Sequence, residues 1–138
     1  MPSTLSLTLA NRRDEISRLV TALEAFAADA GVAHDVMFRV TLALDEIVTN
    51  VMRHAYPPED DRQEIVVRVS ADQDVVTAVV EDTGVAFNPL TVPPANVDAP
   101  IEDRPIGGLG MHLVRSIAQS VTYLREGDRN VLRVTVGR

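Results

Sequence analysis

Residues 42–56 read LALDEIVTNVMRHAY, and this stretch organises the interpretation of the whole chain. Its apolar side chains recur three or four residues apart, as on one face of a helix: Leu44, Ile47, Val48 and Val51. Glu46 and Asn50 are four residues apart and therefore project from the same side of that helix, one turn from each other. Arg53 and His54 extend this polar face, and the two prolines that follow the stretch end the helix.

The Glu46–Asn50 pair has two interpretations. A carboxylate one turn from a carboxamide could serve a metal ion and a proton transfer together. It could equally belong to a solvated helix face, where such pairs are common. The spacing alone leaves both open.

Composition narrows the class of protein. The chain has 138 residues, of which 46% are hydrophobic and 24% are charged, as expected for one globular domain. A net charge of −7 argues against non-specific nucleic-acid binding, which needs clustered Lys and Arg. The absence of Cys excludes disulfides, thiolate zinc sites and cysteine nucleophiles. We see no signal peptide and no membrane-spanning run, so we expect a cytoplasmic protein with no direct nucleic-acid or membrane partner.

Periodicity along the chain predicts an α/β (α+β) fold. The expected strands are 5–9, 65–69, 75–80, 121–125 and 132–136, and the expected helices are 14–30, 34–55 and 109–117. These elements predict a two-layer sandwich, in which three helices pack on one face of a mixed, mostly antiparallel sheet of four or five strands.

The run 75–80 is almost continuously β-branched and leads directly into Glu81-Asp82-Thr83-Gly84. An aspartate at the end of a buried strand can present its carboxylate in a pocket, while a glycine two residues later lets the backbone turn closely. The alternative is an ordinary turn at the end of a strand, where Asp and Gly are also favoured.

Residues 85–106 hold five of the eight prolines and show no regular period. A long irregular loop within a compact domain is often a lid. Gly107-Gly108-Leu109-Gly110 follows and opens a helix, so its free N–H groups could cradle phosphate, or the glycines could form a flexible hinge. No Gly-Lys-Ser/Thr follows and the pattern is not G-x-G-x-x-G after a strand, which excludes Walker A and Rossmann motifs.

The order of these three motifs resembles the nucleotide-binding fold (the Bergerat, or GHKL, fold) of histidine kinases, Hsp90-type chaperones, type II topoisomerases and mismatch-repair proteins of the MutL kind. Within that superfamily, DEIVTNVMRHAY, EDTGVAFNP and GGLGMHLVRSI are similar to the anti-sigma factor serine/threonine kinases of bacteria. The resemblance covers about residues 5–136. It implies a single histidine-kinase-like ATPase domain over residues 1–138, with an ATP lid at about 84–110.

The resemblance also implies a cofactor set, ATP or ADP with Mg²⁺, and roles for the residues of the helix. Glu46 would be the general base that polarises the attacking hydroxyl. Asn50 would coordinate Mg²⁺, and Arg53 would lie near the phosphates. A single amide ligand suits Mg²⁺, which keeps several waters and takes few protein oxygens.

The two later motifs would hold the rest of the nucleotide. By the same resemblance, Asp82 would accept a hydrogen bond from the adenine amino group, and Gly84 would let the backbone approach the base. Gly108 and Gly110 would place backbone N–H groups on the phosphates as part of the lid.

Two positions depart from the superfamily pattern. Ala86 replaces the second glycine of Asp-x-Gly-x-Gly, and residues 126–131 contain no Gly-Thr pair. Asn130 and Thr135 are candidates to substitute for that pair, and the sequence assigns neither. His54 lies beside the expected site and is not interpreted as a phosphoacceptor histidine.

Three functions are compatible with these observations. The resemblance implies a protein-serine kinase that phosphorylates an anti-anti-sigma partner with a STAS-type domain and otherwise sequesters a sigma factor. It also implies a homodimer, and we expect the edge of strand 5–9 to form the contact. The second is an ATP- or ADP-gated switch that captures a partner without phosphotransfer, and Ala86 and the proline-rich lid leave room for it. The third is an interaction domain of the same fold that binds no nucleotide.

Overall fold

The computed structural model describes residues 3–56, 63–91 and 108–138. Its elements follow the predicted order: β1 (Ser3–Ala10), α1 (Glu15–Ala30), α2 (His34–His54), β2 (Glu64–Ala71), β3 (Val75–Asp82), the short 3₁₀ helix η1 (Pro89–Thr91), α3 (Gly108–Ile117), β4 (Ser120–Glu126) and β5 (Arg129–Gly137). Residues 92–107, which make up much of the expected lid, lie outside the described residues.

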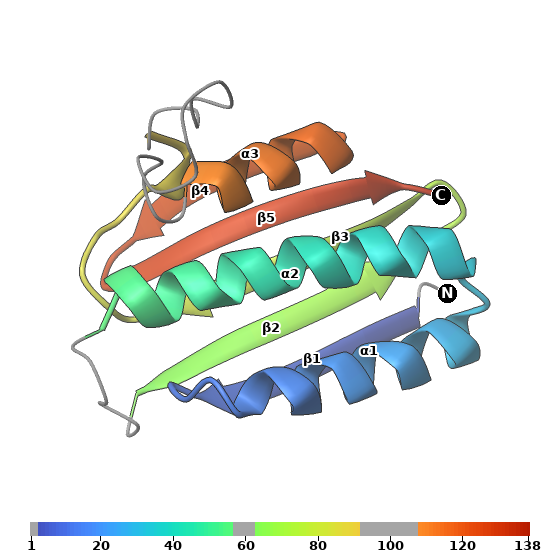
Figure 1. Cartoon of the computed structure of the whole chain (residues 1–138), viewed down its shortest axis with the longest axis horizontal. Coiled ribbons are helices and arrows are strands. Elements are labelled where there is room, and N and C mark those ends of the chain that lie inside the picture. The colour runs from blue at the N-terminus through green and yellow to red at the C-terminus, as the bar shows by residue number, and fades with distance from the viewer. Residues whose placement is uncertain (1–2, 57–62, 92–107) are drawn as a thin grey trace.

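The strands form one sheet in the order β1-β2-β3-β5-β4 (Figure 1). The predicted α/β fold class is confirmed, with five strands and three α-helices among the described residues. The sequence suggested a mixed sheet, but every pairing among the described strands is antiparallel. The reason is the place of β5. It lies between β3 and β4 and runs antiparallel to both, so the parallel β3 and β4 never pair.

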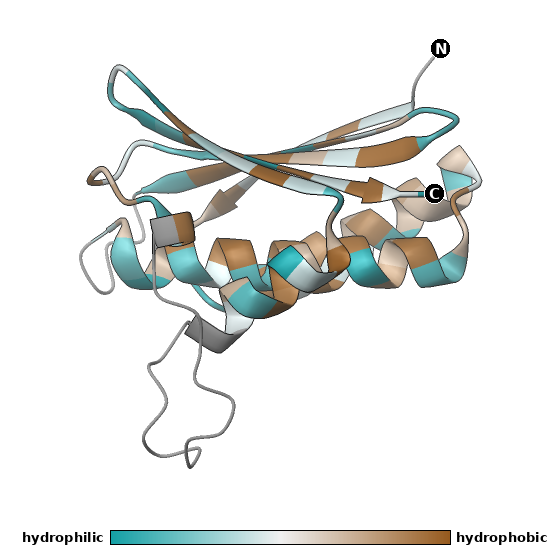
Figure 2. Ribbon diagram, turned by 90° about the horizontal axis from the view of Figure 1, so that it is seen from above, coloured by the Kyte–Doolittle hydropathy of each residue, from teal (hydrophilic) through white to brown (hydrophobic). Residues whose placement is uncertain are grey.

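The helices form a single layer on one face of the sheet, as Figure 2 shows. In the described ranges, the opposite sheet face carries no helix. No helix in the described part of the chain is long and apolar enough to cross a membrane.

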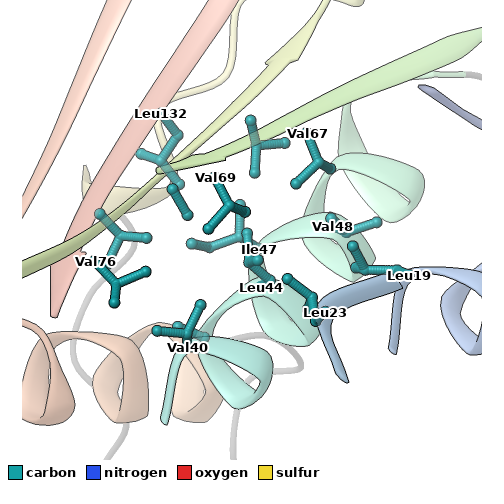
Figure 3. Close-up of a cluster of buried hydrophobic side chains, with 14 of the residues drawn as sticks. Leu19, Leu23, Val40, Leu44, Ile47, Val48, Val67, Val69, Val76 and Leu132 are labelled. Atoms are coloured by element: carbon teal, nitrogen blue, oxygen red, sulfur yellow. The ribbon is translucent and has the colours of Figure 1, made fainter. Parts of the chain in front are cut away.

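The core lies between these layers and follows the alternation of each strand. In β2 and β3, the inward positions are buried and the intervening positions are half-buried or exposed. Leu44, Ile47 and Val48 of α2 meet Val67 and Val69 of β2 in the core cluster (Figure 3). Burying each such side chain contributes roughly 1.5–3 kcal/mol. This packing fixes which face of α2 points to the sheet and which side chains remain for the site.

The outer edge of β1 is partly occupied by side chains of α1. Glu15 Oε1 accepts a hydrogen bond from the Ala10 N–H at 2.9 Å, and Arg18 donates to the Thr8 carbonyl at 2.9 Å. Glu15 and Arg18 are also paired with each other at 3.0 Å. Such blocking of an edge strand limits pairing with another chain. Any contact through this edge therefore has to use its first residues or displace the pair.

Candidate functional site

Asp82 is the last residue of β3 and points toward the helix layer. It is 5% exposed. Its Oδ1 accepts one hydrogen bond from the Gly84 N–H and one from the Asn130 side-chain amide, each at 2.9 Å. Neither of these bonds uses Oδ2, which accepts no hydrogen bond from the described residues. The structure thus holds the carboxylate by one oxygen and leaves the other available.

The surroundings of Asp82 oppose its ionisation. Burial raises the pKa of this carboxyl above the usual aspartate range. The hydrogen bonds from Asn130 and Gly84 and the positive charge of Arg125 act in the opposite direction without cancelling it. Perturbed carboxylates of this kind cluster at functional sites, although structural networks also produce them.

A small pocket opens beside Asp82, between α2 and the sheet, with about 20 Å³ open to the centre of a water-sized sphere. Its walls are mainly apolar, with Ile47 from α2 and Val80 and Leu132 from β3 and β5. Asn50 and Asp82 are polar groups on its surface. Apolar walls with a few convergent polar groups are the usual lining of a small-molecule site.

Helix α2 supplies the other polar side chains, as its periodicity predicted. Asn50 is 6% exposed and lines the pocket, and its amide makes no hydrogen bond with the described residues. Glu46, one turn earlier, is half-buried and lies against the first turn of α3. A Cβ built on Gly110 would lie 2.1 Å from Glu46 Oε2, so the two predicted residues are direct neighbours. Gly108 is the first residue of α3, where backbone N–H groups lack partners within the helix.

Gly84 packs against the end of α2. A Cβ at this position would lie 2.2 Å from the Ala55 carbonyl oxygen, and the next residue, Val85, donates its N–H to that oxygen at 2.9 Å. The structure thus gives a reason for glycine here that the sequence did not reveal, a close contact between two backbones. Its approach to adenine stays a prediction.

Asn130 is the polar residue that sequence reasoning left unassigned. It begins the inward face of β5, directly opposite Asp82 on β3, and is 5% exposed. Its amide nitrogen donates to Asp82 and to the Val85 carbonyl, and its oxygen accepts from the Tyr123 hydroxyl. The alternation of β5 was the available signal, because Asn130 shares the inward parity of its buried valines.

The last turn of α2 lies near Phe87, in the described first part of the segment predicted to be a lid. The His54 ring stacks on Phe87, with ring centroids 4.7 Å apart, and Phe87 lines the pocket. Burial, and then the charge of Arg53, lower the pKa of His54. Arg53 itself is exposed, so the described contacts do not place it in the pocket.

The pocket offers few protein ligands for a metal ion. Among the described residues, no group of three or more His, Asp or Glu side chains could hold a metal ion by itself. Asn50 offers an amide oxygen at the pocket without a competing hydrogen bond from described residues. This fits an ion that takes one or two protein ligands and completes its shell with water and phosphate oxygens.

Comparison with known proteins shows the family of the chain. A family model described as a histidine kinase-like ATPase domain matches residues 9–136. Serine-protein kinase RsbW of Listeria monocytogenes serotype 4a (strain HCC23) is 30% identical over 132 residues, which cover 92% of this chain and 83% of the relative. The chain therefore belongs to the histidine kinase-like ATPase family, in the branch of the anti-sigma factor serine kinases.

Two further similar proteins are longer than this chain, which matches only part of each. Serine-protein kinase RsbW of Bacillus mycoides (strain KBAB4) is 31% identical over 106 residues, which cover 74% of this chain, and the chain spans only 65% of that relative. The crystal structure of the RsbU and RsbW domains of Rv1364c from Mycobacterium tuberculosis matches 98% of this chain and 33% of that one, with a TM-score of 0.68 and 17% identity. This structural likeness shows the fold alone.

Proposed function

We propose that this chain binds ATP with Mg²⁺ and transfers the γ-phosphate to a serine hydroxyl of a protein. The observation that carries the proposal is the buried Asp82 carboxylate, which is fixed through Oδ1 and leaves Oδ2 as an acceptor beside an apolar pocket. A flat base with an exocyclic amino group suits this arrangement. The family to which the chain belongs supports ATP as that ligand.

The phosphates would extend toward Glu46 and the first turn of α3. The free N–H groups and the positive dipole end of that helix favour an anion there. Glu46, next to Gly110, would accept the proton of the attacking serine hydroxyl. Asn50 would hold Mg²⁺, which neutralises charge on the phosphates when bound.

The segment at about 84–110 would act as the lid over the bound nucleotide. Arg115 of α3 donates a hydrogen bond to the Leu90 carbonyl in η1, which links the described first part of this segment to the helix that follows it. Gly108 and Gly110, at the C-terminal end of this segment, would supply backbone N–H groups to the phosphates. Arg53 would stay at the periphery, close enough for an outer contact with phosphate.

The acceptor and partner follow from the branch of the family. We propose an anti-anti-sigma protein with a STAS-type domain as the substrate and a sigma factor as the sequestered partner, in the cytoplasm. A homodimer through the edge of β1 would have to accommodate the Glu15–Arg18 pair described above.

Phosphotransfer to an anti-anti-sigma protein from γ-labelled ATP tests the proposal. Glu46→Gln should keep ATP affinity and lower transfer by roughly 10²–10⁴-fold, the usual contribution of a general base. Asp45→Asn is the matched control, because Asp45 precedes Glu46 on α2 and its carboxylate faces Thr49. Unchanged transfer in Glu46→Gln, or release of phosphate into solution in place of transfer to protein, would contradict the proposal.

The alternative, a nucleotide-gated switch without phosphotransfer, rested in part on Ala86. This residue is exposed and does not line the pocket, so its methyl group does not narrow the described site. We therefore keep the kinase as the proposed function, and the same experiment would reveal a switch as tight nucleotide binding without labelled protein.

A further inference from the structure

Asn130 has every polar atom of its side chain engaged. Both N–H groups of the amide are used, one by Asp82 Oδ1 at 2.9 Å and one by the Val85 carbonyl at 2.8 Å. The amide oxygen accepts from the Tyr123 hydroxyl at 2.5 Å, from Arg125 at 3.2 Å and from the Phe87 N–H at 3.4 Å. No donor is left over for a ligand.

The partners also fix which way the amide faces. A carboxylate and a carbonyl only accept hydrogen bonds, whereas a guanidinium and a backbone N–H only donate. A flipped amide would place its oxygen against Asp82 and its N–H groups against Arg125. The network therefore permits one orientation, with the nitrogen toward Asp82.

This orientation decides how Asp82 presents itself to the pocket. The amide nitrogen and the Gly84 N–H both hold Oδ1, so Oδ2 is the oxygen left for a ligand. Arg125 helps to hold the Asn130 amide in this orientation, because it donates to the Asn130 amide oxygen and also to the Gly84 carbonyl. A bare acceptor at this point matches an exocyclic amino group and disfavours a carbonyl.

We propose that Asn130 is a positioning residue that sets the base specificity of the site. It holds Asp82 as an acceptor, so that the pocket takes a 6-aminopurine nucleotide and rejects a 6-oxopurine nucleotide. This inference rests on the proposed nucleotide-binding function and adds to it a residue that acts only through Asp82.

The electrostatics of the pair supports the inference. Burial raises the pKa of Asp82, and the hydrogen bond from Asn130 is the largest influence that lowers it. Without that donor, the carboxyl would more readily hold a proton and present an O–H group to the pocket. A protonated carboxyl can donate a hydrogen bond to a 6-oxo group, so the preference for an amino group would weaken.

Asn130→Asp is the direct test, because it keeps the shape of the side chain and places a second carboxylate against Asp82. Like charges so close share a proton. Calorimetry with ATP and with ITP, each with Mg²⁺, should show that the wild-type chain prefers ATP by roughly tenfold or more, as expected for a hydrogen bond to a charged group. In Asn130→Asp the ratio of the two affinities should fall toward one. Gln73→Glu, in the exposed β2–β3 turn, is the control for the added charge.

Asn130→Ser provides a second variant if Asn130→Asp does not fold. Its hydroxyl can donate only one hydrogen bond, so the ATP-to-ITP ratio should again fall. A folded variant that loses affinity for both nucleotides equally, or loses none, would overturn the inference and leave the proposed function intact. A wild-type chain that binds neither nucleotide would overturn both, and one that binds both equally would refute the role of Asp82 and with it that of Asn130.

Discussion

Gly84→Ala is the substitution whose cost the structure defines best. The new Cβ would lie 2.2 Å from the carbonyl oxygen of Ala55 and 2.7 Å from its carbonyl carbon. Ordinary contacts between carbon and oxygen begin at roughly 3.3 Å, so the turn and the end of α2 must separate by about 1 Å. The Ala55 carbonyl group belongs to the backbone and the new Cβ is fixed to it, so neither can rotate away.

The magnitude follows from two effects. Overpacking of this kind costs roughly 1–3 kcal/mol, and the hydrogen bond from Val85 to Ala55, at 2.9 Å, would be lost at about 1 kcal/mol. We therefore expect Gly84→Ala to lower the free energy of unfolding by about 2–4 kcal/mol and Tm by roughly 6–12 °C. Urea unfolding and a thermal scan followed by circular dichroism would measure both.

Gly110→Ala is the matched control for Gly84→Ala. Its Cβ would lie 2.1 Å from Glu46 Oε2, but that atom ends a flexible side chain and can move away. We expect a stability within about 1 kcal/mol of the wild type, together with reduced phosphotransfer, because the carboxylate is displaced. A Gly84→Ala protein that unfolds within about 0.5 kcal/mol of the wild type would refute the close packing of the turn on α2.

Two further predictions test the surroundings of the site. Asp82→Asn removes a carboxyl whose pKa is raised in the folded state. Such a carboxyl contributes to stability at a pH below the ordinary aspartate pKa, and this contribution is lost as the pH rises through the raised pKa. In urea titrations, the stability of the variant should therefore match that of the wild type near pH 3–4 and equal or exceed it at pH 7. The variant should also bind ATP roughly tenfold or more weakly. A clear loss of stability at pH 7 would contradict this prediction. Tyr56→Phe removes a hydroxyl that donates to the Glu64 carbonyl at 2.8 Å and accepts from the Thr83 N–H at 2.9 Å. We expect the free energy of unfolding to fall by about 1–3 kcal/mol. No change in that free energy would show that these two hydrogen bonds do not stabilise the fold.

The sequence predicted the local features of the fold well. The apolar period of residues 42–56 and the prolines after it defined the course and the end of α2, which the structure gives as His34–His54. The same period placed Glu46 and Asn50 on one side of the helix. These features depend on neighbours a few residues apart, so a single sequence contains them.

The remaining features depend on contacts between distant residues. Asn130 meets Asp82 only through the register of β5 on β3, 48 residues along the chain. The contact between Gly110 and Glu46 and the packing of Gly84 on Ala55 arise when helices dock on the sheet. Hydrophobic period and turn composition do not specify such contacts, which is why Asn130 stayed unassigned and Gly84 received a different role.

The central claim is that the pocket beside Asp82 binds an adenine nucleotide. Calorimetric titration of the wild-type chain and Asp82→Asn with ATP, each with and without Mg²⁺, tests it most directly. The account predicts Mg²⁺-dependent ATP binding to the wild type and binding that is roughly tenfold or more weaker in a folded Asp82→Asn protein. Equal binding by both proteins, or no binding to the wild type at millimolar ATP, would contradict it.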